Sequence, residues 1–179
     1  MSIKEPELVF IDNFIENSNE LFVSLRDNIV WDERIRARKT ASFGVAYDYS
    51  NITYPQVEMY SSLIPICNQI ESDIGFSPNN CLLNYYPDGS STMGYHSDSA
   101  HELKVGTGVV IISLGSERYI SFRSKVDKEI KFKYQLFCGN LLYMNKAVQD
   151  SWMHAIPKQD GAGERISLSF RNIISNYKE

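Results

Sequence analysis

Residues 81–98 read Cys-Leu-Leu-Asn-Tyr-Tyr-Pro-Asp-Gly-Ser-Ser-Thr-Met-Gly-Tyr-His-Ser-Asp. The stretch begins with a run typical of a buried strand, turns at Pro87-Asp88-Gly89, and ends with His96 and Asp98 two positions apart. In an extended segment, residues i and i+2 lie on the same side, so one face offers an imidazole nitrogen and a carboxylate oxygen. This pair can supply two ligands to one metal ion.

A third ligand must come from elsewhere in the chain, which has three histidines: His96, His101 and His154. His154 falls in a segment that predicts a strand, and it would complete a set of two histidines and one carboxylate. Such a set leaves three neighbouring octahedral positions open and is typical of non-haem Fe(II) oxygenases. The alternative is that His96 and Asp98 form a surface pair and that His154 is an interior histidine with a structural role.

The part of the chain from Asn80 onward has a hydrophobic period of two, and turn residues separate its apolar runs. The expected strands are Cys81–Tyr86, Gly94–Asp98, Gly108–Leu114, Tyr119–Ser124, Glu129–Lys133, Leu136–Cys138, Asn140–Met144, Trp152–Ile156 and Arg165–Ile173. Many short strands at this spacing favour a sandwich or barrel. The predicted fold class is α+β, mainly β: a double-stranded β-helix (jelly roll) core braced by N-terminal helices.

The N-terminal part is expected to contain one strand and two helices. Residues 7–14 indicate a short strand, and the apolar spacing that follows predicts a helix over 14–30 with Ser18 as its N-cap. A second helix is expected over 55–74. Pro65 should kink or divide this second helix, because proline lacks the amide hydrogen that an interior helical position uses.

Bulk properties restrict the class of protein and its location. The 179 residues, 43% hydrophobic and 22% charged, fit one globular domain with a full core. No window approaches the ~18 apolar residues of a membrane span, and residues 1–7 lack a signal-peptide core, so we expect no membrane partner and a cytoplasmic location, or a nuclear one in a eukaryote. Three widely spaced cysteines indicate reduced thiols. A net charge of −4 argues against binding nucleic acid mainly through bulk positive charge.

The segment 31–50 nevertheless combines cations with aromatic side chains. Arg34, Arg36 and the Arg38-Lys39 pair precede Tyr47-Asp48-Tyr49. This composition is typical of a site where a phosphate backbone and a base plane are contacted together. On composition alone, the better supported interpretation is a solvated surface loop with structural tyrosines.

The C-terminal segment Arg165-Ile-Ser-Leu-Ser-Phe-Arg171 has the pattern of a strand. Its alternation places Arg165, Ser167, Ser169 and Arg171 on one side and the apolar residues on the other. Two arginines inside a jelly roll would be costly unless they are paired, and a dicarboxylate ligand would pair with both through two-pronged hydrogen bonds. The alternative is a salt-bridged edge strand with both arginines directed outward.

Taken in order, four motifs resemble the AlkB family of Fe(II)- and 2-oxoglutarate-dependent dioxygenases: Asn84-x-Tyr86, His96-x-Asp98, His154 and Arg165-x5-Arg171. The resemblance runs from about Arg38 to Asn172. It implies that His96, Asp98 and His154 are catalytic and bind Fe(II), with 2-oxoglutarate and O2 as co-substrates.

The same resemblance implies the residues that bind 2-oxoglutarate. Arg165 would pair with the distal carboxylate, with Tyr86 beside it. Arg171 and Asn84 would lie near the carboxylate that adjoins the keto group. The family often has asparagine where this chain has Ser167, which would remove one hydrogen bond to the co-substrate.

A substrate lid is also implied. Tyr47-Asp-Tyr49-Ser50 matches a Tyr-x-aromatic-Ser block of the family, so Tyr49 would stack on a base opposite His96. Many members that act on nucleic acid carry acidic residues just after the metal-binding aspartate, where this chain has serine and alanine. The candidate substrate-binding residues are Arg38, Lys39, Phe43, Tyr47, Tyr49 and Ala100, with the first two contacting phosphates.

The function that this resemblance implies is oxidative demethylation of N-alkylated bases in DNA or RNA. The base would have to be single-stranded or flipped out of the helix. One alternative, which the acidic pI and Ala100 favour, is an AlkB-like hydroxylase or demethylase of a protein side chain or small molecule. Another is a non-catalytic jelly-roll binding module. We expect a single domain over 1–179, with helices and lid in 1–79 and the jelly-roll core in 80–179.

Overall fold

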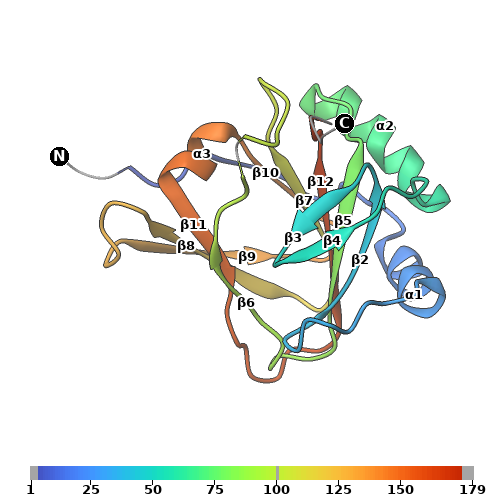
Figure 1. Cartoon of the computed structure of the whole chain (residues 1–179). Helices are drawn as coiled ribbons and strands as arrows, with labels where there is room; N and C mark the ends of the chain where they lie inside the picture. Colours follow the sequence, from blue (N-terminus) through green and yellow to red (C-terminus); the bar gives the residue numbers. More distant parts are fainter. Residues whose placement is uncertain (1–3, 100, 175–179) are drawn as a thin grey trace.

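The computed structural model describes residues 4–99 and 101–174, and these contain three antiparallel sheets, of which the two larger ones pack face to face (Figure 1). The six-stranded sheet has the order β1 (Leu8–Ile11), β10 (Leu141–Met144), β7 (Val109–Gly115), β12 (Arg165–Arg171), β5 (Asn80–Tyr86) and β2 (Lys39–Gly44). The four-stranded sheet has the order β6 (Met93–His96), β11 (Trp152–Ile156), β8 (Arg118–Ser124) and β9 (Lys131–Leu136). The predicted jelly-roll fold is confirmed.

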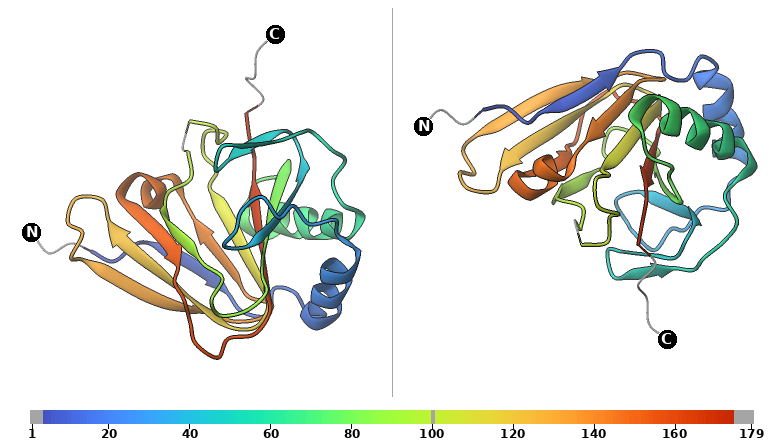
Figure 2. Two further views of the ribbon diagram at one scale, coloured as in Figure 1. Left: turned by 60° about the horizontal axis from the view of Figure 1, so that its bottom comes forward. Right: turned by 90° about the horizontal axis from the view of Figure 1, so that it is seen from above.

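Two hydrophobic cores lie on the two faces of the six-stranded sheet, and β12 shows why. Its apolar residues Ile166, Leu168 and Phe170 pack against the helices α1 (Ser18–Asn28) and α2 (Ile64–Ile74). The alternate positions face the four-stranded sheet, where a second core includes Phe122 and Trp152. Figures 1 and 2 show the helices on one side of the large sheet and the small sheet on the other. Arg165 and Arg171 are therefore directed between the sheets.

The two helices differ from the predictions at their starts. In α1 the N-cap position is Asn17 rather than Ser18, and no side chain caps it. The second helix begins at Ile64, after a short 3-10 turn η1 (Ser61–Leu63), and not near residue 55. Pro65 lies in its first turn, where the missing amide hydrogen costs no hydrogen bond, so proline starts this helix and does not kink it.

The β-rich part also contains elements that the sequence pattern did not show. One strand, β9, replaces the two strands that were expected around residues 129–138. A short helix, α3 (Lys146–Ser151), precedes β11, and the Asn145 side chain caps it by accepting a hydrogen bond from the Val148 amide at 3.0 Å. Strands β1 and β2 form the two edges of the six-stranded sheet, and both precede residue 80 in the chain. The sheet therefore includes strands from the N-terminal part and is not confined to residues 80–179.

The segment expected to be a lid is a β-hairpin, β3 (Tyr47–Tyr49) and β4 (Ile52–Tyr54). Its two turn residues, Ser50 and Asn51, have φ of 51° and 60°. Two successive positive φ values are those of a type I′ turn, whose twist matches that of a two-residue hairpin. None of the helices in residues 4–99 and 101–174 is long and apolar enough to cross a membrane.

Candidate metal centre

His96, Asp98 and His154 converge at one end of the space between the sheets. Strands β6 and β11 are neighbours, and His96 lies directly opposite His154 in their register. Asp98 follows two residues after His96, beyond the end of β6. One ligand atom from each of the three side chains lies within 4.8 Å of the other two. The arrangement offers two nitrogen ligands and one oxygen ligand to a single ion.

Neighbouring groups orient two of these ligands. The Nδ1 of His96 lies 2.9 Å from the Gly94 carbonyl oxygen, and donation to that oxygen leaves Nε2 unprotonated for a metal. Asp98 Oδ1 accepts a hydrogen bond from Arg171 Nε at 2.9 Å and a second from Arg171 Nη2. Asp98 Oδ2 is buried, has no hydrogen-bond partner among the described residues, and lies 3.8 Å from His154 Nε2. An unpaired carboxylate oxygen beside two imidazoles fits a metal ion.

The electrostatics hold both buried ligands in their metal-binding protonation states. Burial alone would raise the pKa of Asp98, but the charge and the hydrogen bonds of Arg171, together with the two neighbouring imidazoles, outweigh it and lower that pKa to about 2. Burial, with the neighbouring His96, lowers the pKa of His154 to about 3. Asp98 is therefore ionised and His154 neutral near neutral pH, as metal binding requires.

The metal-free protein is expected to lose stability as the pH falls below the ordinary histidine pKa of 6.5. Between pH 6.5 and about 3, the unfolded chain binds a proton at His154 that the folded chain does not bind, so acid favours unfolding. This group contributes at most about 1.4 kcal/mol per pH unit. Denaturant unfolding of the wild type and of His154→Gln measures the effect. The variant should show the shallower pH dependence, and equal slopes would contradict the assignment.

A second set of unpaired polar atoms lies deeper between the sheets, at Arg165 and Tyr86. Arg165 is fully buried, and its Nη2 donates a hydrogen bond to Ser113 Oγ at 2.9 Å. Its Nε and Nη1 and the Tyr86 hydroxyl form no well-aligned hydrogen bond among the described residues, although the hydroxyl lies close enough to oppose the lowering of the Arg165 pKa. Burial lowers the pKa of Arg165 to about 10, so the group remains charged. A buried cation beside an unpaired hydroxyl fits a carboxylate ligand.

The other predicted co-substrate residues are buried on the same face. Arg171 is committed to Asp98, and its guanidinium carbon lies 4.9 Å from the centre of the Tyr47 ring. Asn84 Oδ1 accepts a hydrogen bond from Arg38 Nε at 2.8 Å. Ser167 lies between Asn84 and Ser113 in the register of three strands. Arg171 thus holds the metal carboxylate, a contact that the sequence did not predict.

Tyr49 and Tyr47 bring the β3–β4 hairpin to the metal centre. The Tyr49 hydroxyl accepts from Arg38 Nη2 at 2.6 Å and donates to Met93 Sδ at 3.0 Å. Its ring centre lies 6.3 Å from that of His96, with the planes at 78°. Beside them is a cavity of about 280 Å³, which bears aromatic, hydroxyl and carboxylate groups. It is lined by Tyr47, Asp48, Tyr49, Ser50, His96, Ser97, Asp98, Ser99 and Glu102.

Three candidate substrate residues are not at this cavity. Arg38 is buried, and its guanidinium donates to Asn84, to the Thr92 carbonyl oxygen and to Tyr49, so it is not placed to contact phosphates. Lys39 and Phe43 lie on the other face of β2, because residues alternate along a strand. Lys39 pairs with Glu33 at 2.6 Å, and Phe43 packs on Tyr60 with ring centres 5.3 Å apart.

Ala100 lies outside the described residues. Sequence reasoning missed Gln149, whose amide oxygen accepts a hydrogen bond from the Asp98 backbone at 2.9 Å. The signal that could have found it is the Asn145 cap followed by helix-forming residues, which marks α3.

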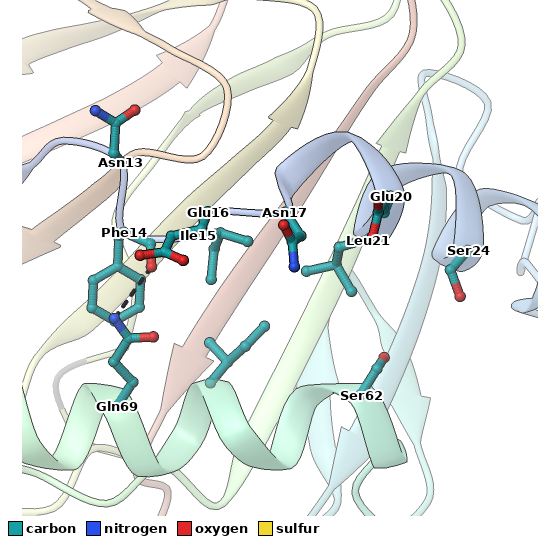
Figure 3. A pocket seen from close by; sticks show the side chains of 11 residues that line it. Asn13, Phe14, Ile15, Glu16, Asn17, Glu20, Leu21, Ser24, Ser62 and Gln69 are labelled. Atoms are coloured by element: carbon teal, nitrogen blue, oxygen red, sulfur yellow. Dashed lines mark hydrogen bonds between the residues drawn. The ribbon is translucent and has the colours of Figure 1, made fainter.

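A larger cleft, of about 590 Å³, lies between α1 and α2 on the opposite face of the six-stranded sheet (Figure 3). Glu16, Glu20 and amide or hydroxyl side chains line it, and Gln69 Nε2 donates to the Phe14 carbonyl oxygen at 3.2 Å across it. No histidine, lysine or arginine is among its lining residues. It therefore lacks the ligands and counter-charges that the space between the sheets provides.

Comparisons with known proteins agree with this geometry. Residues 24–171 match the 2OG-Fe(II) oxygenase superfamily. The chain is 30% identical over 184 residues to the alpha-ketoglutarate-dependent dioxygenase alkB homolog 3 of Bos taurus, covering 92% of this chain and 64% of that protein. It is 29% identical over 153 residues to the DNA oxidative demethylase ALKBH2 of Bos taurus, covering 79% and 55%. The chain thus spans less than two thirds of these relatives.

A fold comparison gives the same architecture. The solved structure of OsALKBH1 superposes with a TM-score of 0.71 over 96% of this chain and 100% of that chain. The sequences are 16% identical, so this likeness concerns the fold alone.

Proposed function

This chain belongs to the 2OG-Fe(II) oxygenase superfamily as an AlkB-like member, and we propose that it oxidatively demethylates N-alkylated bases in DNA or RNA. The observation that carries the proposal is two groups of buried polar atoms, both between the sheets, that lack partners among the described residues. One is the His96–Asp98–His154 cluster with the free Asp98 Oδ2, and the other is Arg165 with Tyr86. The first fits Fe(II), and the second fits the distal carboxylate of 2-oxoglutarate.

The metal and co-substrate, when bound, supply the oxidation of a C–H bond by O2, and an oxidised N-methyl group is released as formaldehyde. The chain's own residues would do three things. His96, Asp98 and His154 hold the ion, and Arg165 and Tyr86 orient the co-substrate in a space from which the packed cores exclude water. Arg171 keeps Asp98 ionised and aligned.

Features of the cavity support a planar, unstacked base as the substrate. Tyr49 borders the cavity beside His96, and an aromatic ring at this place can contact a base that has left its stack. One of the similar proteins is a DNA oxidative demethylase, ALKBH2 of Bos taurus. With Arg38 buried, phosphate contacts would come from exposed cations outside the cavity, such as Arg34 and Arg36.

A second candidate function is demethylation or hydroxylation of a protein side chain or small molecule. The specific observation that favours it is the absence of lysine and arginine among the residues that line the cavity. The residues that line the cavity instead include two with carboxylates, Asp48 and Glu102.

Formaldehyde release separates the two candidates. The protein with Fe(II), 2-oxoglutarate and ascorbate is incubated with N-methylated single-stranded oligonucleotides and, in parallel, with methylated peptides. We expect release from the oligonucleotides, and none when His96→Ala replaces the wild type. Release from the peptides alone would overturn the nucleic-acid proposal in favour of the second candidate.

A further inference from the structure

The backbone amide of Asp98 receives no hydrogen-bond acceptor from strand pairing. Strand β6 ends at His96, so residues 97–99 lie outside the strand ladder. Asp98 is nevertheless 7% exposed, and its amide hydrogen must find an acceptor because an unpaired buried amide is costly. The acceptor is Gln149 Oε1, at 2.9 Å.

Gln149 is itself fixed from several directions. Its side chain is 1% exposed, and its Nε2 lies 3.8 Å from Met144 Sδ, which leaves Oε1 directed at Asp98. Its backbone amide donates to the Asn145 carbonyl oxygen at 3.3 Å, and its backbone carbonyl oxygen accepts from Lys125 Nζ at 2.6 Å. A buried side chain held at both ends has little freedom to move away from its partner.

The position of Gln149 connects two parts of the metal centre. It lies in α3, which leads directly into β11 and His154. Residues 149–154 therefore contribute to the metal centre twice. His154 is itself a ligand, and Gln149 accepts the hydrogen bond that holds the backbone of a second ligand, Asp98. Without the Gln149 contact, Arg171 alone would fix Asp98, and it does so through the carboxylate rather than the backbone.

We propose that Gln149 is a positioning residue of the metal centre, whose amide oxygen fixes the Asp98 backbone so that Oδ2 stays free for the ion. The proposal rests on the metal site of the proposed function and not on its substrate. Groups that orient metal ligands through hydrogen bonds commonly set metal affinity, and their loss costs about 10- to 100-fold.

The test measures Mn(II) binding by calorimetry, without co-substrate, in three variants. Gln149→Leu keeps the side-chain size but removes the acceptor, and it should weaken Mn(II) binding about 10-fold or more. Gln149→Glu keeps an acceptor oxygen and should recover most of the affinity. Ile70→Ala, in α2 on the opposite face of the six-stranded sheet, removes a fully buried side chain and should lower the melting temperature while leaving the Mn(II) affinity unchanged.

Co(II) absorption supplies a second readout. The visible bands of bound Co(II) report coordination geometry, and they should change in Gln149→Leu and not in Ile70→Ala. Wild-type Mn(II) affinity in Gln149→Leu, or an equal loss of affinity in Ile70→Ala, would overturn the proposal. Because the probe is the metal alone, a failed demethylation assay leaves this result untouched, and the two proposals can fail separately.

Discussion

Replacing Asp98 with alanine is expected to abolish the oxidation of 2-oxoglutarate, with a loss of about 10³-fold or more. The change removes Oδ2, the unpaired oxygen at the centre of the ligand cluster, and leaves two histidines on neighbouring strands. Two imidazoles would bind Fe(II) too weakly to hold it through turnover. Succinate formation by the wild type and the variant, at saturating Fe(II), measures the loss.

The same substitution has a cost to folding that must be separated from the chemistry. Arg171 would keep a buried charge without its carboxylate, and the loss of one partner of such a pair costs about 3–5 kcal/mol. The double variant Asp98→Ala with Arg171→Met should recover stability but no activity. Asp160→Asn, in the exposed loop before β12, is the matched control and should retain full turnover. Activity that returned together with stability would mean that Asp98 is structural.

The sequence predicted the parts of this site that depend on strand alternation. In β12, two arginines six positions apart had to share a face, and the structure places both between the sheets. Composition grouped Arg38 with Lys39, but the two side chains have different partners. Arg38 lies in a bend just before β2 and is buried against Asn84 and Tyr49, whereas Lys39 begins β2 and pairs with Glu33.

The parts that the sequence did not predict depend on long-range contacts. The helix α3 is six residues long, and a segment of this length is stabilised by its tertiary surroundings and not by its own helix propensity. The contact between Gln149 and Asp98 joins residues 51 apart in the chain. No local sequence pattern predicts that the side-chain amide of Gln149 will lie beside the backbone amide of Asp98, so only the folded structure shows this part of the site.

Replacing Arg165 with methionine is expected to weaken 2-oxoglutarate binding about 100-fold or more while it stabilises the ligand-free protein. The loss follows because the distal carboxylate would be buried without its counter-charge, at a cost of about 3–5 kcal/mol. The gain follows because the ligand-free protein buries a guanidinium with two unpaired donors, and an apolar side chain of similar size removes that cost, about 1–3 kcal/mol. Calorimetric titration of the Mn(II)-loaded protein with 2-oxoglutarate, and denaturant unfolding, measure the two effects.

Arg118 provides the contrast that makes this prediction specific. Both arginines are fully buried, and their guanidinium carbons lie 5.5 Å (Arg118) and 5.2 Å (Arg165) from the Tyr86 ring centre. Arg118 donates to the carbonyl oxygens of Asp88, Ser91 and Pro157, so Arg118→Met should destabilise the fold. Arg165, by contrast, donates from Nη2 to Ser113 Oγ, and its Nε and Nη1 have no hydrogen-bond partner among the described residues. If Arg165→Met destabilised the ligand-free protein as much as Arg118→Met, Arg165 would be a structural residue, and the co-substrate site would have to lie elsewhere.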